Sequence, residues 1–198
     1  MDDEDELRLR GEAVIAEIEA MEEGGIQSTL PLTDADAMLI GELIQHVTWA
    51  DFNGRRLLQL LDEIEGLPPR SPNHCLRDNE IIPAIRDRLD AIPGLSADQS
   101  ADLETALSQI DRMVDIRHAF AHLALRRHWT DDVVIGFSMN NREAQRKTGS
   151  DLSPQVAMTV AIPMEAVRSN MGPLSRNSEF FAIFVGESIS RFSRLGQN

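Results

Sequence analysis

The sequence predicts a mainly α fold, a helical bundle of about four main helices with a small antiparallel β-hairpin insertion. Over most of the chain, apolar residues recur at intervals of three and four, the spacing of one helix face. Two short runs, residues 133–139 and 156–162, are instead rich in apolar and β-branched residues, which is typical of strands. The chain has 198 residues, of which 42% are hydrophobic, and this is enough to bury a single core.

Residues 1–23 form the first predicted helix, and it is strongly acidic. The segment contains ten carboxylates and only two basic residues, Arg8 and Arg10, which gives it a net charge of −8. Its apolar stripe is thin. We therefore predict that residues 1–25 form an acidic N-terminal arm and that the helical domain covers residues 26–198.

A second helix is expected after Thr33 or Asp34, either of which suits an N-cap. Its apolar pattern continues to Ile64, and the Gly-Leu-Pro-Pro sequence at residues 66–69 ends it. Gly54 falls in the middle of the apolar stripe. A glycine at this place indicates either close packing against another helix or a bend.

Two further helices follow in the middle of the chain. A short one is predicted over Glu80–Ile92, with Pro83 in its first turn. A long one is predicted from about Ala97 to Leu125, because its apolar residues alternate spacings of four and three, as in the seam of a bundle. These apolar positions are Leu103, Leu107, Ile110, Val114, Ala121 and Ala124.

The two strand-like runs are predicted to pair as an antiparallel hairpin. The connecting segment, residues 140–154, is polar and basic and would form a long tip. Pro163 is expected to open a short helix that ends at Asn170. A last helix is predicted over about Asn177–Leu195, with phenylalanines on its buried face.

Composition excludes several classes of protein. No apolar run approaches the roughly 20 residues that cross a bilayer, so no membrane association is expected. The acidic start resembles neither a signal peptide nor a transit peptide, and a lone cysteine, Cys75, rules out an internal disulfide, so we expect a cytoplasmic protein. The net charge of −14 disfavours nonspecific binding to nucleic acid. However, residues 112–147 carry seven basic residues against four acidic ones, a local net of +3.

A charged residue interrupts the apolar stripe of the long predicted helix. At about 100° per residue, Arg117 falls inside the stripe, where a guanidinium is costly to bury without a partner. Two explanations fit: Arg117 makes a buried ion pair, or it lines a polar cleft or a subunit interface. His118 and His122 lie four residues apart on one edge of the stripe. Asp111 and Asp115 lie on the same edge, so the four residues form one continuous ridge.

The stretch Asp-Ile-Arg-His-Ala-Phe-Ala-His resembles the Arg-polar-x3-His signature of the HEPN (higher eukaryotes and prokaryotes nucleotide-binding) superfamily. Arg117, His118 and His122 match its three marked positions, and Ala121 before the last histidine is also typical. The family pattern departs at Leu123, where a glycine commonly follows, and this leaves the end of the helix open. The order of the predicted elements over roughly residues 34–195 is also similar to that of small bacterial members.

The resemblance implies a metal-independent RNA endonuclease that acts as a homodimer through the motif helix and needs no cofactor. Such an enzyme uses the 2′-hydroxyl of RNA as the nucleophile and leaves a 2′,3′-cyclic phosphate and a 5′-hydroxyl. His122 would be the general acid/base, Arg117 the phosphate clamp, and His118 a polar orienter or substrate contact. By the same analogy the protein is a toxin or defence factor, and an antitoxin-like protein is an expected partner.

Three residues directly after the motif, Arg126, Arg127 and His128, are candidates for binding substrate. They would guide the phosphate backbone of RNA, or they merely solvate the end of a helix. Trp49 and Phe52 have ring faces on which a base can stack, but aromatic residues on a long helix are more often core, so we expect them to be buried.

Two other interpretations of the motif stay open. In a non-catalytic dimerisation or nucleotide-binding module, Arg117 would be paired with an acid and His122 covered, whereas in an enzyme both would be partly exposed in a cleft. A metal site is the other, since His118 and His122 have the spacing of two ligands on a helix. We expect no metal, because no glutamate follows His118 as in zinc proteases. The candidates for a third ligand are His74, Cys75 and His128.

Overall fold

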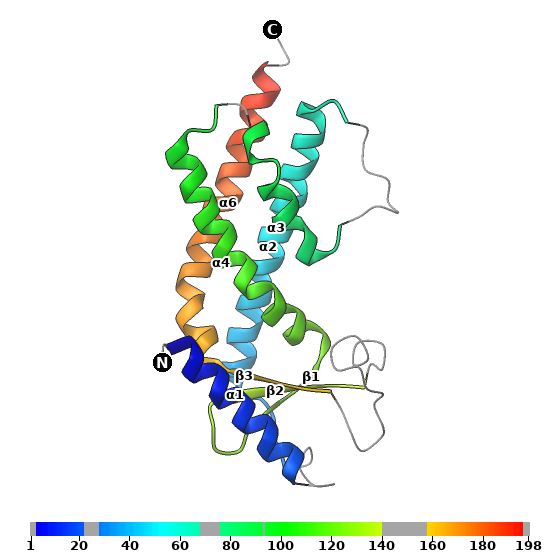
Figure 1. Cartoon of the computed structure of the whole chain (residues 1–198), viewed down its shortest axis with the longest axis vertical. Helices are drawn as coiled ribbons and strands as arrows, with labels where there is room; N and C mark the ends of the chain where they lie inside the picture. Colours follow the sequence, from blue (N-terminus) through cyan, green and yellow to red (C-terminus); the bar gives the residue numbers. More distant parts are fainter. Residues whose placement is uncertain (1–2, 22–27, 68–75, 93, 140–157, 196–198) are drawn as a thin grey trace. The chain divides into compact units, whose positions relative to one another are not determined.

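A computed structural model describes residues 3–21, 28–67, 76–92, 94–139 and 158–195. Within them the protein is mainly helical and carries a small antiparallel sheet, as the sequence predicts (Figure 1). Internal contacts divide the chain into two compact units. Unit 1 comprises residues 1–41 and 118–170, and unit 2 comprises residues 42–117 and 171–198. Among the helices described, none combines the length and the apolarity that a membrane crossing requires.

The elements follow one another along the chain as labelled in Figure 1. They are α1 (Asp3–Ala20), α2 (Asp34–Ile64), α3 (Asp78–Arg86), a 3-10 turn (Leu89–Ala91), α4 (Ala97–His122), β1 (Ala124–Arg127), β2 (Val133–Ser138), β3 (Met158–Pro163) and α6 (Met164–Leu195).

Thr33 is the N-cap of α2. Its hydroxyl accepts a hydrogen bond from the backbone N–H of Asp36 over 3.1 Å, and the Asp36 carboxylate accepts one from the backbone N–H of Thr33 over 3.0 Å. This reciprocal pair satisfies two backbone donors that a helix start leaves open. The side chain that caps α2 is therefore that of Thr33, one of the two predicted candidates.

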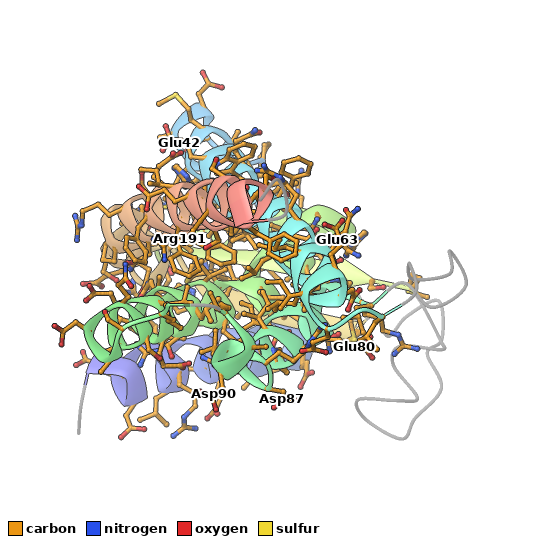
Figure 2. All side chains as sticks on the ribbon, turned by 90° about the horizontal axis from the view of Figure 1, so that it is seen from above. Glu42, Glu63, Glu80, Asp87, Asp90 and Arg191 are labelled. Carbon is orange, nitrogen blue, oxygen red and sulfur yellow. The ribbon has the colours of Figure 1, made fainter. Side chains whose placement is uncertain are left out.

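Unit 2 is a helical bundle formed by α3 and the parts of α2, α4 and α6 that belong to it. Its fully buried side chains come from all four helices and include Leu57, Ile85, Leu103, Leu107 and Phe181. The predicted close approach at Gly54 is confirmed, because a Cβ there would lie 2.7 Å from Cγ2 of Ile81 on α3. The acidic residues of the unit that Figure 2 labels lie at its surface, whereas Asp62 is buried and pairs with Arg88 over 2.7 Å.

Unit 1 contains the sheet and the acidic helix α1. Val14 and Ile18 of α1 are buried in one cluster with Val133, Ile135 and Phe137 of β2. The helix predicted to form an arm is thus one side of a hydrophobic core, because its thin stripe is enough to cover the sheet. Internal contacts place α1 in the same compact unit as the start of α2. The sequence also predicts that Gly24 and Gly25 end this helix, and these two residues lie outside the described residues.

The sheet has three strands in the order β1-β2-β3, so the prediction of a two-stranded hairpin was incomplete. The missed strand is β1, which occupies residues that were assigned to the end of the long helix. α4 stops at His122, and Arg126 then pairs with Ile135 of β2. Leu30 also exchanges two backbone hydrogen bonds of 2.8 Å with Arg127. If α4 continued past His122, the backbone N–H and C=O groups of these residues would be bonded within the helix instead.

Two helix boundaries also differ from the prediction. α3 begins at Asp78 and ends at Arg86, which places Pro83 beyond its first turn. α6 is one continuous helix that includes Pro173, although two helices were predicted, one ending at Asn170 and one beginning at about Asn177. Leu174 has no exposed surface, and its burial favours the helical path through the proline. The predicted hairpin tip, residues 140–154, lies outside the described residues.

Candidate functional site

The motif lies at the end of α4, and the boundary between the two units falls inside it. Arg117 is the last α4 residue of unit 2, and His118 and His122 belong to unit 1. The arginine and the two histidines therefore belong to different compact units.

Arg117 makes an ion pair across unit 2. Its Nη1 donates a hydrogen bond to Oδ2 of Asp78 at the start of α3 over 2.8 Å. The Arg117 side chain is only 19% exposed, whereas that of Asp78 is 44% exposed. The Nε of Arg117 is buried and has no hydrogen-bond partner among the described residues. The first explanation for a charge inside the stripe, an ion pair, is thus correct, and one buried donor of the guanidinium, the Nε–H, has no partner among the described residues.

Asp78 is shared between two arginines. Its Oδ1 accepts a hydrogen bond of 3.1 Å from Nη2 of Arg55, which also binds Asp51 one turn earlier on α2. Arg55 Nη1 donates to the carbonyl oxygen of Leu76 over 3.1 Å. Two cations and two anions therefore link α2, α3 and α4 at one point of unit 2. No sequence pattern predicted this network, because residues that bond directly in it, such as Arg117 and Asp78, are as many as 39 positions apart.

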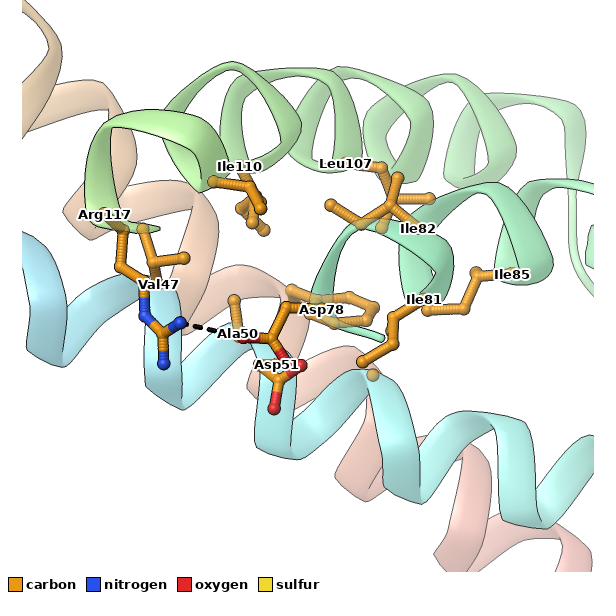
Figure 3. Close-up of a pocket in the computed structure, with 13 residues that line it drawn as sticks. Val47, Ala50, Asp51, Asp78, Ile81, Ile82, Ile85, Leu107, Ile110 and Arg117 are labelled. Atoms are coloured by element: carbon orange, nitrogen blue, oxygen red, sulfur yellow. Dashed lines mark hydrogen bonds and ion pairs between the residues drawn. The ribbon is translucent and has the colours of Figure 1, made fainter. Parts of the chain in front are cut away.

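A small cavity lies beside this ion pair. Its internal volume is about 20 Å³, which is room for about one water molecule. Ile81, Leu107 and Phe181 contribute to its mostly apolar wall, while Arg117 and Asp78 supply the polar side (Figure 3). Arg117 therefore lines a small, mostly apolar cavity in addition to being paired.

His118 and His122 are both exposed in unit 1. Their ring centroids lie 4.5 Å apart with 50° between the ring planes. The structure thus brings the two motif histidines together and leaves them accessible to a solute. In unit 2, Asp111 of the predicted ridge is held by Arg86, whose Nη1 donates to its Oδ2 over 2.8 Å.

Arg126 and Arg127 are both engaged inside unit 1. Arg126 donates to the hydroxyl and the carbonyl oxygen of Thr29 over 3.2 and 2.7 Å. Arg127 lies between Asp36 and Asp132, with hydrogen bonds of 2.7 Å to each. Both arginines are partly buried, so their present partners are protein atoms of unit 1 rather than solvent.

The carboxylates around Arg127 are held in their charged form. A hydrogen bond from Arg168, assisted by Arg127, lowers the pKa of Asp132 to about 2. Burial acts to raise the pKa of Asp36, but hydrogen bonds from Thr33 and Arg127 outweigh it and lower that pKa. This cluster of opposite charges fixes β1 and the turn after it.

His128 is buried, with a relative exposure of 1%, so it does not offer its ring to a phosphate backbone in this conformation. His128 was predicted to contact RNA at the surface, but the chain turns inward after Arg127, at the end of β1, and places it in the interior. His128 also does not complete a metal site with the motif histidines. Among the residues described, it groups instead with Glu17 and Asp131, and His118 and His122 acquire no third ligand. His74 and Cys75 lie outside the described residues.

Trp49 and Phe52 are exposed, by 40% and 50%, so the expectation that they belong to the core was wrong. Their rings stack with centroids 5.5 Å apart and 14° between the planes. The guanidinium of Arg56 lies 5.7 Å from the centre of the Phe52 ring. Helical spacing alone does not tell an apolar core position from an exposed aromatic pair.

Comparison of the chain with protein-family models, with curated proteins and with solved structures found no match.

Proposed function

We propose that the protein is a metal-independent RNA endonuclease of the HEPN type. The observation that carries the proposal is the exposure of His118 and His122, whose rings lie 4.5 Å apart at the end of α4. A histidine kept for structure is usually covered or hydrogen-bonded, whereas one that moves protons must reach its substrate. Together with Arg117, these side chains form the sequence pattern that resembles the HEPN signature.

The proposed reaction needs no metal. His122 takes the proton from the 2′-hydroxyl of RNA or delivers one to the leaving 5′-oxygen, and His118 orients it or contacts the substrate. Arg117 stabilises the negative charge that develops on the phosphorane. In a homodimer formed through α4, each chain would supply one copy of this set.

Arg117 can take this role only if its donors are available. Asp78 occupies Nη1, but Nε has no partner among the described residues. A carboxylate binds a guanidinium with the same geometry as a phosphate does, so Asp78 holds the place that a phosphate oxygen would take. We therefore propose that the substrate phosphate either adds to this pair or displaces Asp78.

A second function is favoured by the same ion pair. In a non-catalytic dimerisation or nucleotide-binding module, Arg117 was expected to be paired with an acid, and it is. The exposed His122 matches the enzyme, in which that residue must be accessible. The two residues thus support different functions, and only an activity measurement separates them.

The test is cleavage of a mixed RNA pool in the presence of EDTA. We expect the wild-type protein to produce 2′,3′-cyclic phosphate ends, and His122→Ala and Arg117→Ala to lose most of this activity. Arg112→Ala is the matched control, because Arg112 is an exposed arginine of the same helix outside the motif. Full activity in a folded His122→Ala protein would rule the proposal out. The module is favoured if no variant cleaves and RNA or nucleotides still bind.

A further inference from the structure

Trp49 and Phe52 form an exposed aromatic pair on α2 that is not part of the motif. Their ring centres lie 5.5 Å apart and the ring planes are only 14° from parallel, which is an offset stack. The two residues are 40% and 50% exposed. From Glu42 to the end of α2, they are the only large apolar side chains that are exposed. On this helix the pair is therefore an isolated flat surface and not part of a broad apolar face.

Arg56 lies beside the pair and is held there by a buried amide. Its guanidinium carbon is 5.7 Å from the centre of the Phe52 ring, within the range of a cation–π contact. Nη1 of Arg56 donates a hydrogen bond of 2.9 Å to Oδ1 of Asn53. Asn53, which has no exposed surface, donates from Nδ2 to the carbonyl oxygen of Trp49 over 2.9 Å. The amide therefore fixes the guanidinium next to the rings before any ligand binds.

This stretch of α2 is positively charged, although the chain as a whole has a net charge of −14. Residues 43–61 contain two arginines, Arg55 and Arg56, and one acid, Asp51, which gives a net charge of +1. Asp51 is paired with Arg55, with 3.0 Å between Nε and Oδ2. Within the described part of the chain, Arg56 makes no ion pair. Its charge is therefore available to an anion that approaches the rings.

An unpaired nucleobase has the chemistry that these side chains would recognise. Its flat face stacks on aromatic rings, and it is linked to a phosphate that a guanidinium can bind. A base inside a duplex is already stacked on both faces, so it cannot join such a stack. We propose that Trp49 and Phe52 stack an unpaired base of single-stranded RNA and that Arg56 binds the adjoining phosphate. This base-stacking site rests on the proposed function for the identity of the ligand as RNA, and it specifies that the substrate is single-stranded.

The experiment follows the fluorescence of Trp49 in the full chain with two background substitutions. Trp129→Phe leaves Trp49 as the only tryptophan, since the sequence has two, and His122→Ala removes the proposed cleavage. The probe is a single-stranded oligoadenylate of about ten nucleotides, within the usual range of single-strand sites. We expect the probe to quench Trp49, because a base that stacks on an indole quenches its emission. An abasic oligonucleotide of equal length and charge should not quench it, and neither should an RNA duplex.

Phe52→Leu is the test variant, because it keeps an apolar side chain and removes the ring. We expect the affinity of this background protein for oligoadenylate to fall about tenfold, within the range of about fivefold to a hundredfold typical of losing one stacked base. Arg56→Gln should weaken binding severalfold and make it less sensitive to salt. Phe180→Leu is the matched control, since Phe180 is another exposed phenylalanine of unit 2 but lies on α6. It should bind as the background protein does.

Three results would overturn the proposal. The first is the absence of quenching at about 1 mM oligonucleotide, a concentration above the usual Kd of nonspecific binding. The second is equal binding of the abasic oligonucleotide, or an equal loss of affinity in Phe52→Leu and Phe180→Leu. The third is Trp49 emission that depends on protein concentration, together with a dimer that Phe52→Leu dissociates, which would make the rings an interface between two copies of the chain.

Failure of this site and failure of the nuclease are distinguishable. A protein that cuts no RNA but binds oligoadenylate through Trp49 keeps the base-stacking site and rejects the nuclease. A protein that cuts single-stranded RNA with the same KM in Phe52→Leu as in wild type, and shows no quenching, keeps the nuclease and rejects the base-stacking site.

Discussion

Nη1 of Arg117 donates a hydrogen bond to Oδ2 of Asp78 over 2.8 Å and so joins the motif helix α4 to the start of α3. This contact explains how an arginine is accommodated inside an apolar stripe. Its charge is matched by a carboxylate that is 44% exposed, and its stem lines a small cavity. The same contact controls how many guanidinium donors Arg117 can offer to a ligand.

Asp78→Asn should destabilise unit 2. The substitution removes the charge that holds both Arg117 and Arg55, although solvent screens an acid this exposed. We expect a loss of about 1 kcal/mol in the free energy of unfolding, measured with urea. Asp87→Asn, at an exposed position near the end of α3, is the control. Equal effects of the two substitutions would show that the network adds nothing to stability.

The same variant should bind RNA more tightly if Arg117 is a phosphate clamp. Asp78 then competes with the substrate for the guanidinium, and removing its charge releases the donor on Nη1. We expect a severalfold lower Kd for an RNA oligonucleotide, measured by fluorescence anisotropy at fixed salt. A double variant, Asp78→Asn with Arg117→Ala, should lose the gain. A gain that persists in the double variant would mean that the effect is only a change in net charge.

Gly54→Ala should destabilise the bundle although alanine is the better helix former. A Cβ at this position would lie 2.7 Å from Ile81 and 3.4 Å from Ile85, so side chains of the core must shift. Overpacking of this kind typically costs about 1–3 kcal/mol, which exceeds the gain of up to about 1 kcal/mol from helix propensity. Gly41→Ala on the same helix has nothing within 4 Å and should be stabilising. Urea unfolding of both proteins measures the difference, and a stabilising Gly54→Ala would contradict the packing described.

Asp132 should contribute stability that is lost in acid. Its pKa is lowered to about 2 by Arg168 and Arg127, below the ordinary value of an aspartate. The carboxylate therefore stabilises the fold above about pH 4, and this contribution falls as the pH drops toward 2. We expect Asp132→Asn to cost about 1 kcal/mol at pH 7, after allowing for the exposure of Arg168, and progressively less below pH 4. Urea unfolding of both proteins across this range gives the measurement. A difference that stays constant down to pH 2 would show that the charge of Asp132 is not responsible.

The helices were predictable from the spacing of their apolar residues, because each helix buries one continuous apolar stripe. α2 begins where Thr33 predicts a cap, and Gly54 makes the expected close contact. The features that sequence reasoning missed depend on partners that are distant along the chain. The strand β1 has only four residues, of which two are arginines, and it forms because β2 and Leu30 supply its hydrogen bonds. Two separate helices were predicted over this part of the chain, but the burial of Leu174 favours a continuous α6.

The candidate site was predictable in its residue types but not in their surroundings. A charge in an apolar stripe requires a partner or a cavity, so the position of Arg117 alone marks it as a candidate site residue. The identity of that partner, Asp78, follows only from the fold. His128 was expected at the surface because it follows two arginines, yet the turn between β1 and β2 buries it against Glu17 and Asp131.

The function that we propose is metal-independent cleavage of RNA, in which the 2′-hydroxyl attacks and His122 transfers protons. The most direct test uses an oligonucleotide that contains one cleavage site identified from the RNA pool, and a copy with a single 2′-deoxy substitution at the nucleotide whose hydroxyl would attack. In EDTA, the wild-type protein should cut the first and leave the second intact, and His122→Ala should cut neither. Cleavage of the deoxy copy, or cleavage that appears only when a metal is added, would contradict the account.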